Sequence, residues 1–207
     1  MKFPSVYYAM VDPAGGHDPV ALARILLEAG ARILQLRLKD APSRDFFAAA
    51  RTIVGLCRAR GALMIVNDRA DIARLAEADG VHVGQDDLPV AAARAIVGAG
   101  RIVGVSTHGV EQARTAEAAG ADYIGFGAIY PGGLKNVANA QGLERLRAVR
   151  SAVRIPIVAI GGITEATAPA VLAAGANAVA IISDVARAAD PGAKARALIA
   201  LGAKIAG

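Results

Sequence analysis

The feature that most constrains the fold of this chain is a regular alternation of short apolar runs with longer amphipathic stretches, which recurs eight times. Short runs of β-branched and apolar residues are typical of buried parallel strands, and the amphipathic stretches are typical of the helices that cover them. Eight βα units in 207 residues are the minimum for a (β/α)8 barrel, whereas a doubly wound sheet needs about five or six strands. We therefore predict an α/β fold, a single-domain (β/α)8 TIM barrel over residues 1–207.

The bounds of the predicted elements come from this periodicity, from capping residues and from glycines that end helices. The expected strands are residues 6–11, 33–38, 63–66, 80–83, 102–105, 123–126, 155–160 and 178–182. The expected helices are roughly residues 18–29, 43–60, 69–77, 89–98, 109–119, 141–152, 164–174 and 191–205. In barrels of this kind the active site lies at the carboxyl ends of the strands, so polar residues there are the first candidates.

Composition excludes several classes of protein. Apolar residues make up 55% of the chain, which is too many for a disordered chain and enough for one large core. No apolar run reaches the roughly 18 residues of a membrane-spanning helix, and the N-terminal residues lack the pattern of a secretory leader. We therefore expect a soluble, cytoplasmic protein. The single Cys57 excludes a disulfide framework.

The net charge of +5 is explained better by small anionic ligands than by nucleic acid. The arginines are scattered along amphipathic segments, and the chain has no Trp and 4% aromatic residues, so platforms for stacking bases are scarce. We expect phosphorylated small molecules as substrates and neither nucleic acid nor a membrane as a partner. The sequence leaves open whether the chain forms a homo-oligomer.

Two cations, Arg37 and Lys39, lie at the end of the second predicted strand. The alternation of side chains along a strand places Gln35, Arg37 and Lys39 on the same side, pointing into the mouth of the barrel. One interpretation is an anion site, and the other is an ion pair with the carboxylate of a neighbouring strand. We favour the anion site because two cations buried together are costly without an anion.

Carboxylates arrive at the same rim from the next two strands. Asn67 and Asp68 end the third strand, and Asp87 follows the fourth. Mg²⁺ is typically held by one or two carboxylates together with phosphate oxygens and water. Each aspartate taken alone is explained better as a helix cap. Together with the neighbouring cations, the two carboxylates favour a site for Mg²⁺ and phosphate.

The remaining candidates lie after the later strands. Ser106 and His108 end the fifth strand, where the serine is either a phosphate donor or a helix cap. His82 is interpreted as a structural histidine inside the fourth strand. Loops after the seventh and eighth strands, at residues 161–164 and 182–184, occupy the place where barrels commonly bind phosphate. The long loop 127–141 is suited to a lid that carries one cation.

At these residues the chain resembles the thiamine phosphate synthase family over nearly its full length, through segments 35–40, 67–69, 78–88, 104–108, 122–125 and 159–163. The resemblance implies Mg²⁺-dependent joining of hydroxymethylpyrimidine diphosphate to thiazole phosphate, with release of diphosphate. It assigns Mg²⁺ to Asp68 and Asp87. It assigns the pyrimidine diphosphate to Gln35, Arg37, Lys39, Asn67, Ser106 and Lys135, and the thiazole phosphate to Gly162, Ile182 and Ser183.

The chain departs from the family pattern in the lid. The family's Pro-Thr-x-Thr-Lys motif is replaced by residues 131–135, in which both threonines are missing. Backbone N–H groups of Gly132 and Gly133 are candidates to replace their hydroxyls at the thiazole phosphate. Two alternatives stay open: a thiazole tautomerase that uses His108 as its acid and base, and a non-catalytic barrel that binds a thiazole or thiamine phosphate.

Overall fold

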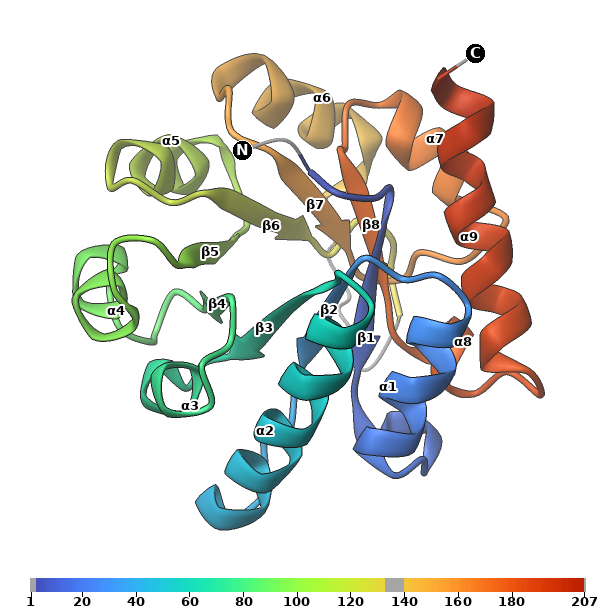
Figure 1. Ribbon diagram of the computed structural model, residues 1–207. Helices are drawn as coiled ribbons and strands as arrows, with labels where there is room; N and C mark the ends of the chain where they lie inside the picture. The colour runs from blue at the N-terminus through green and yellow to red at the C-terminus, as the bar shows by residue number, and fades with distance from the viewer. Residues whose placement is uncertain (1–2, 133–139, 207) are drawn as a thin grey trace.

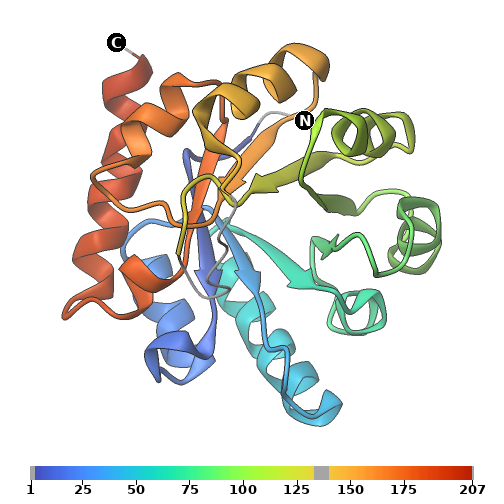
Figure 2. The ribbon, with the colours of Figure 1, turned by 180° about the vertical axis from the view of Figure 1, so that it is seen from behind.

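The computed structural model describes residues 3–132 and 140–206 and consists of a closed barrel of parallel strands surrounded by helices (Figure 1). The strands follow one another around the barrel in sequence order, and β1 pairs with β8 to close it. The view from behind shows the same ring of helices outside the strands (Figure 2). The predicted (β/α)8 fold is confirmed.

The elements agree closely with the predicted ones. The strands are β1 (Tyr7–Val11), β2 (Ile33–Leu36), β3 (Leu63–Asn67), β4 (Gly80–Val83), β5 (Ile102–Thr107), β6 (Tyr123–Gly127), β7 (Ile157–Ile160) and β8 (Ala178–Ile181). The helices are η1 (Pro13–Gly15), α1 (Pro19–Glu28), α2 (Ser43–Ala59), α3 (Ala70–Leu75), α4 (Val90–Val97), α5 (Val110–Ala118), α6 (Gly142–Ala152), α7 (Ala168–Ala173), α8 (Ser183–Ala186) and α9 (Pro191–Ala206).

Several differences from the predicted elements lie at the rim where the site forms. Helix α7 begins at Ala168, four residues later than expected, and β5 extends to Thr107, two residues further than expected. Strand β2 ends at Leu36, two residues earlier than expected, so Arg37 and Lys39 belong to the loop that follows it. The short helices η1 and α8 were not predicted. Both follow strand ends and are too short to show a helical period of apolar residues.

Apolar side chains pack in two layers. The larger layer lies between the barrel and its helices, and it contains the outward residues of the strands together with the buried Cys57. The smaller layer fills the barrel itself with side chains such as Tyr8, Ile33, Ile65 and Tyr123. A filled interior is typical of this fold and leaves the carboxyl ends of the strands as the place for a site.

No helix among the described residues is long and apolar enough to cross a membrane.

Candidate active site

A cavity of about 570 Å³ opens at the carboxyl ends of the strands. It is lined by ten of the residues proposed from the sequence: Gln35, Arg37, Lys39, Asn67, Asp68, Asp87, Ser106, His108, Gly132 and Ile182. Gly162 and Ser183 do not line it, although their neighbours Gly161 and Ile182 do. Gly133 and Lys135 lie outside the described residues. The structure thus brings candidate residues from the ends of six strands into one cavity.

Arg37 and Lys39 are both paired with carboxylates, as the alternative interpretation of the sequence expected. Arg37 Nη1 lies 2.5 Å from Asp12 Oδ2, and Lys39 Nζ lies 3.5 Å from Asp68 Oδ2. Asp12 directly follows β1 and also accepts a hydrogen bond from the backbone N–H of Ala14 at 2.9 Å. Its side chain is 3% exposed, so Arg37 compensates a buried charge besides facing the cavity.

Asp68 and Asp87 face each other across the rim. Burial raises the pKa of Asp68, the negative charge of Asp87 raises it further, and Lys39 opposes the rise. Asp68 has a φ of 63°, a strained conformation for a residue with a side chain, of the kind that clusters at functional sites. Asp87 Oδ2 also accepts a hydrogen bond from the N–H of Gly84 at 2.7 Å. The pair thus concentrates negative charge beside Lys39.

This donor set fits Mg²⁺ bound jointly with a phosphorylated substrate. Within residues 3–132 and 140–206 no group of three or more His, Cys, Asp or Glu side chains could hold a metal alone. Mg²⁺ takes one or two protein carboxylates and fills its other positions with water and phosphate oxygens. A cation bound here would neutralise the negative charge of Asp87, which disfavours the charged form of Asp68.

The interior wall of the cavity carries a histidine and two tyrosines that sequence reasoning did not place in the site. His82 Nδ1 lies 2.9 Å from the Tyr123 hydroxyl, and His82 Nε2 lies 2.9 Å from Ser106 Oγ. The Tyr8 hydroxyl lies 2.7 Å from that of Tyr123. A Cβ at Gly104 would collide with the Tyr123 ring, so this glycine makes the arrangement possible. The sequence signal that could have placed these three residues in the site is that each lies on a predicted strand with its side chain towards the barrel interior.

Burial lowers the pKa of His82 to about 4, although the negative charge of Asp87 opposes the shift. His82 therefore takes up a proton with a pKa near 6.5 in the unfolded chain but only near pH 4 in the folded chain. Between these values the free energy of unfolding should fall with falling pH, by about 3 kcal/mol at most from this residue. Urea denaturation of wild type and His82→Gln from pH 7 to 4 measures this contribution, because the difference between their free energies of unfolding should change with pH. A difference that stays constant over this range would contradict the prediction.

His108 lies at the rim with its orientation set by the backbone. His108 Nδ1 lies 2.7 Å from the carbonyl oxygen of Gly127, which can accept but not donate, so Nδ1 carries the proton. Nε2 has no hydrogen-bond partner among the described residues. The lone pair of a neutral imidazole is thus available at this nitrogen.

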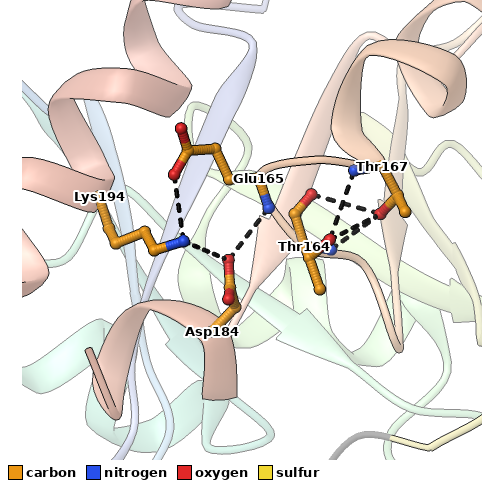
Figure 3. A network of polar contacts seen from close by, with 5 residues as sticks. All are labelled: Thr164, Glu165, Thr167, Asp184 and Lys194. Atoms are coloured by element: carbon orange, nitrogen blue, oxygen red, sulfur yellow. Dashed lines mark hydrogen bonds and ion pairs between the residues drawn. The ribbon is translucent and has the colours of Figure 1, made fainter.

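The loop after β7 is joined to helices α8 and α9 by a polar network (Figure 3). Asp184 Oδ2 accepts from the N–H of Glu165 at 3.0 Å and lies 3.4 Å from Lys194 Nζ, which also pairs with the Glu165 carboxylate at 3.1 Å. Gly162 has a φ of 64°, and a Cβ there would lie 2.6 Å from the Tyr130 carbonyl oxygen. The loop that follows Gly162 is therefore held close to Ser183, the first residue of α8.

The fold and this cavity together define a (β/α)8-barrel enzyme that acts on small phosphorylated substrates. The family model for thiamine monophosphate synthase matches residues 7–185, and the chain belongs to this family. It is 50% identical over 185 residues to the thiamine-phosphate synthase of Moorella thermoacetica, covering 89% of this chain and 88% of the relative. The corresponding protein of Chlorobium luteolum is 47% identical over 185 residues, covering 89% and 87%.

A solved structure gives the same result. A thiamine phosphate pyrophosphorylase from Pyrococcus furiosus superposes with a TM-score of 0.90 at 36% identity, covering 97% of this chain and 96% of that one. The resemblance found in the sequence is confirmed.

Proposed function

We propose that this protein is a thiamine-phosphate synthase that joins hydroxymethylpyrimidine diphosphate to thiazole phosphate and releases diphosphate. Family membership supports the reaction. The observation that carries the assignment within the site is the pair Asp68 and Asp87 beside Lys39 at the cavity rim. A departing diphosphate carries negative charge that Lys39 would stabilise directly, and a divalent cation held by Asp68 and Asp87 would supply further positive charge.

The described residues divide into two groups around the reacting atoms. Lys39, Asn67 and Ser106 line the cavity and would donate hydrogen bonds to the diphosphate, and Gln35, which also lines it, would bind the pyrimidine ring. Mg²⁺ held by Asp68 and Asp87 would supply positive charge to the departing oxygens. Gly132, Ile182 and the loop that begins at Gly161 would bind the second phosphate.

The proposed reaction needs electrostatic stabilisation more than proton transfer. As the bond between the pyrimidine methylene carbon and the diphosphate oxygen breaks, its electron pair stays on the diphosphate, and the cations and donors around it stabilise that charge. The ring delocalises the positive charge left on carbon. The thiazole nitrogen then donates its lone pair to this carbon, and binding both substrates in one cavity provides the proximity.

The decisive test supplies purified protein with both substrates and Mg²⁺ and measures thiamine phosphate and diphosphate. We expect both products in equal amounts, and neither without the divalent cation. A folded protein that binds these ligands without forming product would be a binding barrel. Metal-independent aromatisation of a thiazole carboxylate phosphate tautomer, lost in His108→Ala, would instead identify a tautomerase in which His108 moves the proton.

The network of Figure 3 gives a prediction about the second substrate. Asp184→Ala removes the acceptor for the Glu165 N–H and a partner of Lys194, so the loop after β7 loses its connection to α8. We expect the KM for thiazole phosphate to rise about three- to tenfold, the effect of one hydrogen bond to a charged group. The KM for the pyrimidine diphosphate should not change.

The control for Asp184→Ala is Glu111→Ala, which removes an exposed ion pair with Arg114 on α5, away from the two loops. Steady-state kinetics with each substrate varied in turn distinguishes the cases. Equal changes in both KM values would show that Asp184 supports the barrel mouth as a whole and not the second phosphate.

A further inference from the structure

Five polar side chains from five strands form a continuous chain of hydrogen bonds across the interior of the barrel. Gln35 Nε2 donates to the Tyr8 hydroxyl over 3.0 Å, and this hydroxyl lies 2.7 Å from that of Tyr123. His82 connects the Tyr123 hydroxyl to Ser106 Oγ through its two ring nitrogens, each at 2.9 Å. All five line the cavity. This Gln35–Ser106 chain therefore joins two positions on its wall.

The number of protons in the chain allows two arrangements. Each hydroxyl carries one proton, and a neutral imidazole has one N–H and one lone pair. A buried hydroxyl proton without an acceptor is unfavourable, so the direction at one end sets the direction of every bond. When Gln35 Nε2 donates, Tyr8 donates to Tyr123, Tyr123 donates to His82 Nδ1, and His82 Nε2–H donates to Ser106 Oγ.

The two ends of the chain then have opposite characters towards a ligand. Ser106 keeps its hydroxyl proton, for which the described residues provide no acceptor, so the proton is free to bind an anion. Gln35 uses its amide nitrogen on Tyr8, and none of the described residues donates to its amide oxygen. If the amide turned over, every bond would reverse. Ser106 would then donate to His82, and its oxygen lone pairs would face the anion.

We propose that every hydrogen bond in the Gln35–Ser106 chain is donated in the direction from Gln35 to Ser106. We further propose that this single polarity couples ligand binding at Gln35 to ligand binding at Ser106. An anion at Ser106 and an N–H donor at Gln35 Oε1 stabilise the same arrangement of protons. The ligand that fits is a diphosphate ester whose ring carries an N–H donor. This proposal rests on the proposed function, and it makes Tyr8, Tyr123 and His82 positioning residues.

The tautomer of His82 is a direct readout of the polarity. Nitrogen-15 NMR of the labelled protein at pH 8 should show His82 protonated on Nε2, with His17→Gln and His108→Gln variants used to assign the three histidines. In Gln35→Glu the ionised carboxylate can only accept, so the proton of His82 should move to Nδ1. Gln35→Met is the matched control, because methionine neither donates to nor accepts from the Tyr8 hydroxyl. This variant should not drive the His82 proton to Nδ1.

A third variant tests whether the Gln35–Ser106 chain of hydrogen bonds transmits the effect of Gln35→Glu to His82. In Tyr123→Phe the connection between Tyr8 and His82 is lost, so adding Gln35→Glu should leave the His82 tautomer unchanged. The proposal is overturned if wild type shows the Nδ1–H form, if Gln35→Glu does not move the proton, or if it moves equally in the Tyr123→Phe background.

Binding of inorganic diphosphate in the presence of Mg²⁺ tests the coupling by calorimetry. Ser106→Ala should weaken binding about tenfold in the wild-type background, because a donor to a charged group is lost. In the Gln35→Glu background the same substitution should weaken it less than about twofold, because Ser106 no longer donates. Equal losses in both backgrounds would refute the coupling. Neither measurement needs turnover, so a protein that passes both yet forms no thiamine phosphate would refute the proposed function alone.

Discussion

Asp68→Asn and Asp87→Asn are each expected to reduce kcat/KM for the pyrimidine diphosphate by about a hundredfold or more. Burial and the negative charge of Asp87 raise the pKa of Asp68, so the pair favours a shared cation. Losing one would remove a proposed Mg²⁺ ligand and the transition-state stabilisation that it would support, about 2.7 kcal/mol for a hundredfold effect. Steady-state rates measured across a range of Mg²⁺ concentrations provide the test, and the metal requirement should shift to higher concentration.

A control separates this effect from the loss of any nearby aspartate. Asp71→Asn removes the partner of Arg69 on the first turn of α3, where the Asp71 side chain is 54% exposed, and should leave kcat/KM within about twofold of wild type. Asp87 has a second role, since it accepts the N–H of Gly84. If Asp87→Asn kept a normal rate and a normal metal requirement, that backbone contact would be its whole function.

The sequence predicts the barrel well because every strand and helix carries a local signal. Parallel strands covered on both faces read as short apolar runs, and the strand ends gather at one rim, so the sequence alone places Asp68, Asp87 and Ser106 together. The elements that local signals miss are the one-turn helices η1 and α8. Four residues or fewer show no period.

Side-chain partners across the barrel are harder to predict, because they depend on the stagger between strands. Tyr8 and Tyr123 are 115 positions apart in the sequence, yet their hydroxyls lie 2.7 Å from each other. His82 could be recognised as a buried histidine, but its two partners could not be named without the register that places Tyr123 opposite Gly104. Asp12, the partner of Arg37, directly follows β1, which pairs with β2, but the sequence alone does not single it out among the possible carboxylates.

The pairing of Arg37 with Asp12 gives the second large prediction, which concerns stability and activity separately. Arg37→Met leaves the Asp12 carboxylate buried without its cation and should lower the free energy of unfolding by about 3 kcal/mol. The double variant Asp12→Asn with Arg37→Met removes both charges and should recover most of this loss. The amide oxygen that Asp12→Asn introduces can still accept the N–H of Ala14.

Activity of the double variant then decides what Arg37 contributes beyond the ion pair. The Arg37 side chain is 19% exposed and lines the cavity, so it can contact a diphosphate while it remains bound to Asp12. We expect both Arg37→Met and the double variant to lose at least about tenfold in kcat/KM, the effect of one hydrogen bond to a charged group, whereas Asp12→Asn alone keeps its rate. Urea denaturation and kinetics on the three variants measure both quantities. A double variant restored in stability and rate together would show that Arg37 serves only to compensate Asp12, and the anion would then depend on Lys39, Ser106 and the metal.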